Sequence, residues 1–208
     1  MHFSLTDLAA DITQNSAESG ADLVELEIHE RQFSPQGQTP GLTGESSLTG
    51  GEFRFIARDN GRGMDRAELK QAMDPFVTDG IKHPGRRVGL GIPFLIQTAA
   101  QSGGGWKISS VKKGTEESAG KPSGTVVEAW FDLANVDTPP VGDIPGLFRT
   151  VLLFAGPREV VLKRKRQGGG EDLDYAVKKT ELSEVLGGLE DVSSLVLLGK
   201  YLRSLEGE

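Results

Sequence analysis

Apolar side chains recur at two different spacings in the first two thirds of the chain, and these spacings predict a mixture of helices and strands. Leu5, Leu8 and Ile12 follow the spacing of a helix, which we expect over residues 4–20. Residues 23–29 and 51–59 alternate apolar and polar side chains, as half-buried strands do. The pattern continues with short helices at 65–73 and 92–101 and with strands at 106–112 and 126–133.

Residues 34–51 interrupt this pattern, because they are rich in Gly, Ser, Thr, Pro and Gln and hold few apolar side chains. Such a composition predicts a loop, and the first two strands would pair as a hairpin around it. A loop of this length is unusual in a compact domain. We interpret it as either a functional flap or a disordered insertion.

Residues 137–142 contain two prolines and a glycine and predict a linker. The chain beyond it predicts a helix at 144–155, strands at 159–166 and 172–178, and helices at 180–186 and 192–205. We therefore divide the chain into a larger domain, residues 1–138, and a small α+β C-terminal region, residues 139–208, whose role the sequence does not give.

Two features of the C-terminal region have alternative interpretations. The last predicted helix carries an apolar stripe, which favours packing on its own domain over a dimer or partner surface. The four consecutive cations at residues 163–166 are expected to form the solvated tip of a hairpin rather than a nucleic-acid patch.

Composition narrows the class of protein. The chain has 208 residues, a formal net charge of -7 and no cysteine. The negative charge disfavours non-specific electrostatic binding to nucleic acid or to an anionic membrane. The lack of cysteine excludes disulfides, thiolate catalysis and cysteine-based metal sites. No apolar run approaches the ~20 residues that span a bilayer, and the N-terminus lacks the pattern of a signal peptide, so a cytoplasmic protein is expected.

Residues 59–64, Asp-Asn-Gly-Arg-Gly-Met, carry the first candidate chemistry. They follow a predicted strand, and we call them the G1 turn. Gly61 and Gly63 allow the backbone to approach a ligand closely, because glycine has no Cβ and tolerates positive φ. Asp59 can accept a hydrogen bond from an exocyclic amine such as that of adenine. An ordinary turn after a strand would explain the same residues.

The first predicted helix carries Asp11, Asn15 and Glu18 on one face, at helical spacing. Such a row is often no more than a solvated polar face. Facing a cleft, Asp11 could orient a water molecule and Asn15 could ligate Mg²⁺ through its side-chain oxygen. Magnesium suits such a site because it binds few protein oxygens and completes its shell with phosphate and water.

A local basic cluster in residues 76–87 stands out in an acidic chain. It is either an ordinary exposed loop or a lid over polyphosphate, with point charges from lysine and a planar fork from arginine. Directly after it, Gly89, Leu90 and Gly91 open an apolar helix. Glycines at a helix start expose backbone N–H groups, and the helix dipole adds positive charge there, which outlines a phosphate site.

With these stretches in this order, the chain resembles the ATP-binding domain shared by DNA gyrase, heat-shock protein 90, sensor histidine kinases and the MutL mismatch-repair proteins, the GHKL superfamily. Residues 11–21 resemble its N box, and residues 59–64 its G1 box. Residues 76–78 and 89–92 resemble the F and G2 boxes around the ATP lid, and residues 124–127 the last glycine box. The similarity covers residues 5–133, and the small stand-alone histidine-kinase-like ATPases of bacteria are the nearest likeness.

This resemblance implies the Bergerat ATP-binding fold, an α/β (α+β) two-layer sandwich with a mixed, mostly antiparallel sheet and helices on one face. The C-terminal region would be a small α+β appendage. The implied ligands are ATP and Mg²⁺. Asp59 would bind the adenine amine, Gly63 would line the base pocket beside Gly61 and Met64, and Thr125 would assist at the adenine through water. Asn15 would hold the magnesium ion, and the phosphate contacts would come from Thr78, Lys82, Arg86, Arg87, Gly89, Leu90 and Gly91.

Two departures from the family affect the expected function. The usual general base is a Glu four residues before the Asn, and Asp11 stands there with a side chain one methylene shorter. None of the three histidines, His2, His29 and His83, has the helical setting of a phosphoacceptor. We therefore expect a slow ATPase or a kinase acting on a separate protein. The alternatives are an ATP-gated binding module that does not hydrolyse ATP, or a scaffold without nucleotide. A protein partner of unknown identity is expected, and a homodimer is one option.

Overall fold

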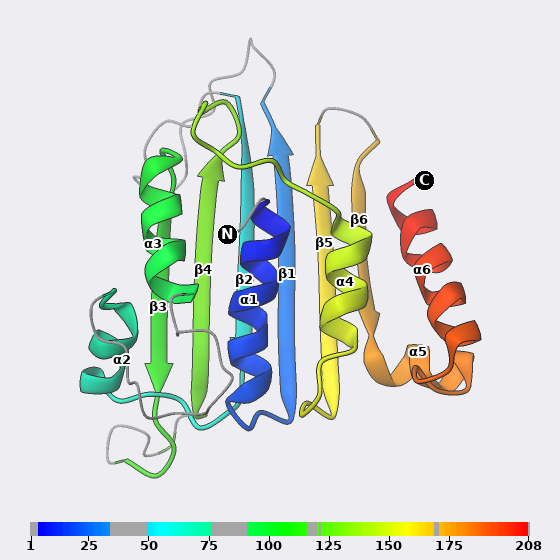
Figure 1. Ribbon diagram of the computed structural model, residues 1–208, viewed down its shortest axis with the longest axis horizontal. Helices are drawn as coiled ribbons and strands as arrows, with labels where there is room; N and C mark the ends of the chain where they lie inside the picture. Colours follow the sequence, from blue (N-terminus) through cyan, green and yellow to red (C-terminus); the bar gives the residue numbers. More distant parts are fainter. Residues whose placement is uncertain are drawn as a thin grey trace.

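A six-stranded sheet in the order β3-β4-β2-β1-β5-β6 carries the fold (Figure 1). In the computed structural model the described residues are 4–33, 50–75, 91–115, 120, 122–168 and 171–207. The strands are β1 (Leu23–Gln32), β2 (Gly51–Asp59), β3 (Gly105–Val111), β4 (Gly124–Asp132), β5 (Glu159–Gln167) and β6 (Leu173–Lys178). Neighbouring strands are antiparallel except β1 and β5, which run parallel. The predicted mixed, mostly antiparallel sheet is confirmed.

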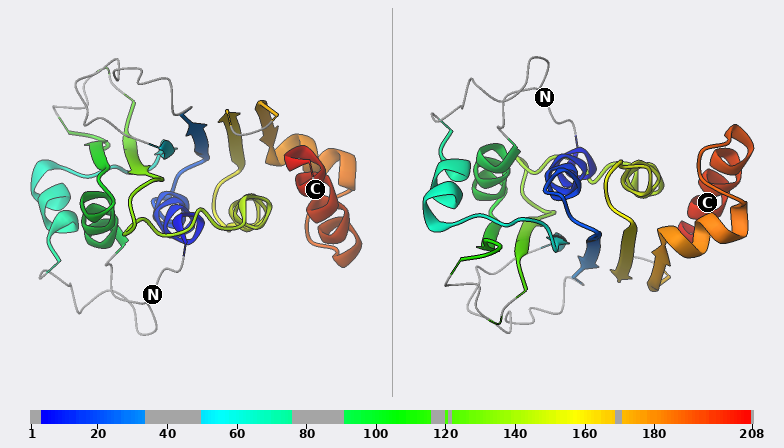
Figure 2. Two further views of the ribbon diagram at one scale, coloured as in Figure 1. Left: turned by 90° about the horizontal axis from the view of Figure 1, so that it is seen from above. Right: turned by 90° about the horizontal axis from the view of Figure 1, so that it is seen from below.

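Helices cover one face of this sheet. They are α1 (Leu5–Glu18), α2 (Arg66–Met73), α3 (Gly91–Gln101), α4 (Ile144–Leu152), α5 (Lys179–Leu186) and α6 (Val192–Glu206). Helices α3, α1 and α4 lie side by side on that face, while α2 lies at the β3 end and α5 and α6 at the β6 end (Figures 1 and 2). No helix among the described residues is long and apolar enough to cross a lipid bilayer.

The core forms where the strands' alternating side chains meet the apolar stripe of α1. In β2, Phe53, Phe55 and Ala57 are fully buried, and they belong to one cluster with Leu8 and Ile12 of α1. Burying each large apolar side chain contributes roughly 1.5–3 kcal/mol. Helix α1 begins where the sequence predicts, because the Ser4 side chain accepts the Asp7 N–H and caps the helix.

The C-terminal region shares this sheet and this core. Strand β5 pairs with β1 along its length, from Leu23 opposite Glu159 to Arg31 opposite Gln167. Helix α4 packs beside α1, and its buried Phe148 belongs to the same cluster as the strands of the first domain. Residues 139–208 thus extend the sheet by two strands on the side of β1 that β2 does not occupy.

The expectation of a solvated hairpin tip at residues 163–166 is wrong for Arg164. This residue lies within β5, and its side chain is 1% exposed. It donates to Glu30 at 2.7 Å and to Glu206 at 3.1 Å, and Glu206 also accepts from the Tyr175 hydroxyl at 2.7 Å. Side chains alternate between the two faces of a strand, so a run of four cations cannot point entirely into solvent.

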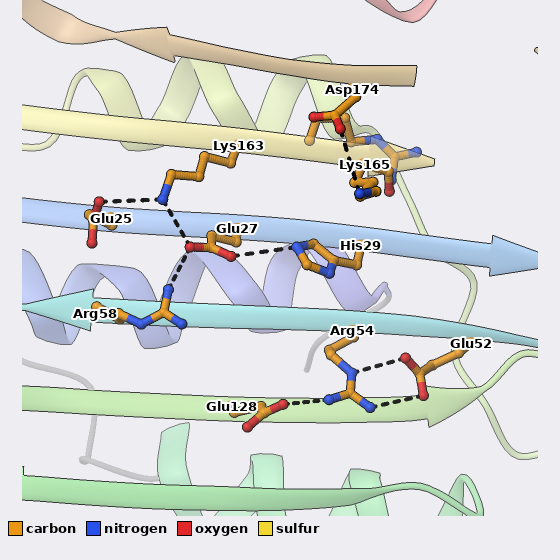
Figure 3. A network of polar contacts seen from close by, with 11 residues as sticks. Glu25, Glu27, His29, Glu52, Arg54, Arg58, Glu128, Lys163, Lys165 and Asp174 are labelled. Atoms are coloured by element: carbon orange, nitrogen blue, oxygen red, sulfur yellow. Dashed lines mark hydrogen bonds and ion pairs between the residues drawn. The ribbon is translucent and has the colours of Figure 1, made fainter. Parts of the chain in front are cut away.

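Paired charges occupy the sheet face opposite the helices (Figure 3). There Glu27 accepts from Lys163 at 3.0 Å and from Arg58 at 2.6 Å. Burial alone would raise the pKa of Glu27, but the hydrogen bond from Lys163 and the positive charge of Arg58 outweigh it and lower the pKa below its ordinary value. Arg54 joins Glu52 and Glu128 in the same way farther along the face.

Candidate functional site

The G1 turn joins β2 to α2, and its own side chains and glycines fix its shape. Oδ1 of Asp59 accepts the Gly61 N–H at 2.9 Å, while Oδ1 of Asn60 accepts two backbone N–H groups at the start of β1. Gly63 has φ +63°, and a Cβ there would lie 1.9 Å from the carbonyl oxygen of Val111. Only glycine fits such a close approach of two backbones. The turn is therefore held between β1 and β3.

The C-terminal end of α1 contacts the G1 turn through Ser19. Its hydroxyl lies 3.1 Å from Oδ1 of Asp59, and its carbonyl accepts the Arg62 N–H at 3.1 Å. A Cβ on Gly61 would lie 1.8 Å from the Ser19 hydroxyl oxygen. These contacts set the distance between the end of α1 and the Asp59 carboxylate.

Thr125 lies beside Asp59, because the two residues pair across β2 and β4. The Thr125 hydroxyl is 2.8 Å from the hydroxyl of Ser110 on β3. The Ser110 hydroxyl also accepts the Met64 N–H at 2.8 Å. The structure thus brings together five of the residues that we predict from the sequence to surround the adenine base: Asp59, Gly61, Gly63, Met64 and Thr125.

Asn15 faces the start of α3. A Cβ on Gly91 would lie 3.4 Å from Nδ2 of Asn15, an ordinary van der Waals distance, so the Asn15 amide lies directly beside this glycine. Asp11 lies one turn earlier on α1, and both Asp11 and Asn15 are exposed. The first part of α3 and the polar face of α1 are therefore adjacent, which is the arrangement expected for a phosphate end.

Helix α2 follows the G1 turn directly and is fixed to β3. Asp65 caps it by accepting the N–H groups of Ala67 and Glu68, and Lys112 donates to Asp65 at 2.9 Å and to Glu68 at 2.8 Å. The Glu68 N–H and the Lys112 ammonium lower the pKa of the Asp65 carboxyl.

Six predicted contacts lie outside the described residues, and the structure gives them no position: Thr78, Lys82, Arg86, Arg87, Gly89 and Leu90. Most of the predicted loop at 34–51 is likewise outside them.

A magnesium ion fits the described site only as a partner of the nucleotide. Within the part of the chain that the structure describes, no group of three or more acidic or histidine side chains could hold a metal ion alone. Asn15 can offer one neutral side-chain oxygen, and the nitrogen of the same amide lies beside Gly91 at the start of α3. Such a sparse donor set suits Mg²⁺, which takes phosphate oxygens and water as its other ligands.

The sequence did not reveal the contributions of Ser19 and Ser110. Ser19 lies within the stretch that resembles the N box, but nothing in that pattern shows that its hydroxyl reaches Asp59 forty residues later. Ser110 stands in an ordinary alternating strand, and only the register of β3 against β4 places it opposite Thr125.

Comparison with known protein families finds one match over more than half of the chain. Residues 4–135 match the family described as histidine kinase-, DNA gyrase B-, and HSP90-like ATPase. Among curated proteins, no sequence matches the chain.

Three solved structures are similar to the chain at low sequence identity. The mycobacterial sensor histidine kinase MprB is 16% identical, with a TM-score of 0.35 over 58% of this chain and 66% of that structure. The Aquifex aeolicus MutL ATPase domain complexed with ADP is 15% identical, with a TM-score of 0.46 over 90% and 70% of the two chains. The N-terminal domain of a DNA repair protein is 10% identical, with a TM-score of 0.49 over 92% and 58%. The chain thus spans from 58% to 70% of the length of these structures.

The family match covers more than half of the chain, and it includes the α1 face, the G1 turn, the start of α3 and the Asp59–Thr125 pair. The chain therefore belongs to the family of histidine kinase-, DNA gyrase B- and HSP90-like ATPases.

Proposed function

We propose that this protein binds Mg-ATP and acts as a slow ATPase, or as a kinase toward a separate protein in a regulatory system. The observation that carries the proposal is the placement of two groups of residues on neighbouring elements. Asp59, Gly63 and Thr125 meet at one end of the site, and Asn15 meets Gly91 at the other.

The first group supports recognition of the base. An ionised Asp59 only accepts hydrogen bonds, so it suits the amine of adenine, and Thr125 beside it can reach the base through water. Gly63 would line the base pocket, and its lack of a Cβ lets the turn pack against the Val111 carbonyl.

The second group supports binding of the phosphates. Asn15 would hold Mg²⁺ through Oδ1, and the ion when bound would neutralise charge on the phosphate oxygens. The backbone at the start of α3 would face the phosphates, where the helix dipole favours negative charge. The lid cations Lys82, Arg86 and Arg87 are proposed as further phosphate contacts on the strength of their charge.

Asp11 is the proposed general base for hydrolysis. In that step, the oxygen of water attacks the γ-phosphorus, its proton passes to the Asp11 carboxylate, and the bond from the γ-phosphorus to the β–γ bridging oxygen breaks to release ADP. Proton transfer requires about 2.6–3.2 Å between heavy atoms, or one bridging water. An aspartate reaches less far than a glutamate, which is the reason to expect slow turnover.

The same short side chain favours a second function, in which ATP binds without hydrolysis. Closure of the lid would then present a surface to a protein partner. The two functions share the base and phosphate contacts and differ only in whether Asp11 transfers a proton.

The test is calorimetry with Mg-ATP on the parent, on Asp59→Asn and on Asp137→Asn, followed by phosphate release on the same samples. Asp137 is an exposed carboxylate in the segment before α4 and serves as the matched control. We expect binding that Asp59→Asn weakens by at least tenfold, because a charged acceptor becomes a neutral amide. Asp137→Asn should bind as the parent does.

Phosphate release then separates the two functions. Turnover that is lost in Asp11→Asn while ATP still binds supports the ATPase. Binding with neither phosphate release nor transfer of a labelled phosphate to a partner supports the gated module. If the parent protein does not bind ATP, both the ATPase and the gated binding module are excluded.

A further inference from the structure

We propose that Ser19 is a positioning residue that holds the Asp59 carboxylate so that the site prefers a base with a 6-amino group. The inference rests on the proposed ATP function and goes beyond it, because it assigns base selectivity to a residue on α1 that need not touch the nucleotide.

The two oxygens of the Asp59 carboxylate have different surroundings. Oδ1 accepts the Gly61 N–H at 2.9 Å and lies 3.1 Å from the Ser19 hydroxyl. Among the described residues, no hydrogen bond reaches Oδ2. One oxygen is therefore held from the protein side, and the other remains available to a ligand.

This asymmetry matters because the terminal torsion of aspartate is soft. Rotation about it is broad and roughly two-fold, so an unrestrained carboxylate presents its acceptors in many directions. Two donors on Oδ1 restrict that rotation and aim Oδ2. An ionised carboxylate in a fixed direction favours a base that donates there and disfavours one that lacks the donor.

The position of the Ser19 hydroxyl is itself well determined. The residue ends α1, with its N–H and its hydroxyl both directed at the Ser16 carbonyl, the hydroxyl at 2.7 Å. Its carbonyl accepts the Arg62 N–H, and its hydroxyl packs against Gly61, where a Cβ would lie 1.8 Å from the hydroxyl oxygen. The single hydroxyl proton is thus shared between the Ser16 carbonyl and Asp59.

The experiment removes the hydroxyl and the amine separately. Affinities for ATP and for purine riboside 5′-triphosphate, which lacks only the 6-amine, are measured by calorimetry on the parent, Ser19→Ala and Ser194→Ala. Ser194 is a buried serine whose hydroxyl donates to the Leu186 carbonyl at 3.0 Å, far from Asp59. It controls for the loss of a side-chain bond to a helix carbonyl.

We expect the parent to prefer ATP over the analogue, and we expect Ser19→Ala to reduce that preference about five- to tenfold. This is less than the usual effect of one hydrogen bond to a charged group, because the Ser19 hydroxyl also donates to the Ser16 carbonyl. The ratio should not change in Ser194→Ala. If Ser19 had only a structural role, Ser19→Ala would weaken the binding of ATP and of the analogue equally, and the ratio of the two affinities would not change.

A second pair of variants tests the inference if Ser19→Ala does not fold. Ser19→Thr and Ser19→Val have the same shape, and only the threonine keeps a hydroxyl. The threonine variant should retain more of the preference for ATP than the valine variant. Equal ratios in folded variants with and without the hydroxyl would overturn the inference. A parent that does not bind ATP would instead overturn the proposed function.

Discussion

Replacement of Arg164 by methionine should destabilise this protein far more than replacement of its neighbour Lys163. The two residues are adjacent in one run of cations, but β5 turns them to opposite faces. The Arg164 side chain is 1% exposed and contacts Glu30 and Glu206, whose side chains are 15% and 6% exposed. The Lys163 side chain is 43% exposed on the open face and contacts Glu27 there.

The expected magnitudes follow from burial. Removing one partner of a buried ion pair leaves an uncompensated charge and costs about 3–5 kcal/mol. Arg164→Met leaves two carboxylates without their guanidinium, although Arg166 and Tyr175 still contact Glu206. Lys163 is itself exposed to solvent, so its contact with the half-buried Glu27 contributes about 0.2–1 kcal/mol, and Glu27 keeps Arg58.

Urea unfolding at neutral pH, followed by tryptophan fluorescence and circular dichroism, measures both free energies of unfolding. Adding Glu206→Gln to Arg164→Met should recover part of the loss, because it removes one of the unpaired charges. If Arg164→Met and Lys163→Met lower the free energy of unfolding by amounts within about 0.5 kcal/mol of each other, the argument that the strand face decides the effect is refuted.

Three further predictions concern the site and the sheet. Gly63→Ala should abolish ATP binding and lower stability by about 1–3 kcal/mol, measured by calorimetry and urea unfolding, because φ is positive and Val111 blocks the Cβ. Glu27 has a lowered pKa when folded, so its contribution to stability is present above its ordinary pKa and is lost as pH falls through the lower folded value. Glu27→Gln should therefore flatten the acid limb of the stability profile below about pH 4.5, and an unchanged limb would count against it. A chain ending at residue 138 should aggregate on size-exclusion chromatography, since it uncovers the β1 edge; a folded monomer would contradict this.

The sequence predicts the elements of this fold well, because their signals are local. Apolar spacing in α1 and alternation in β1 and β2 each reflect which side chains meet the core, and the cap at Ser4 marks a helix start. The fold class followed from the resemblance of four short stretches, whose order is itself a property of the sequence.

What the sequence could not show depends on contacts between distant residues. Arg164 is buried because β5 pairs with β1 and because the last turn of α6 brings Glu206 against the Arg164 side chain. The link from Ser19 to Asp59 arises from the close approach of α1 to the G1 turn. Such contacts leave no local periodicity in the sequence. The local pattern therefore does not show that Arg164 pairs with Glu30 and Glu206, or that Ser19 contacts Asp59.

The parallel pairing of β1 with β5 also has a consequence for synthesis of the chain. The two strands are joined by a side-chain contact between residues 136 positions apart, so β5 leaves the ribosome long after β1 and β2. At roughly 5–20 residues per second, the β1 edge waits about 7 to 27 seconds for its partner. Distant parallel pairing is also slow to form. A nascent chain therefore carries an open strand edge during this interval, and chaperone demand should depend on the rate of translation through the second half of the message.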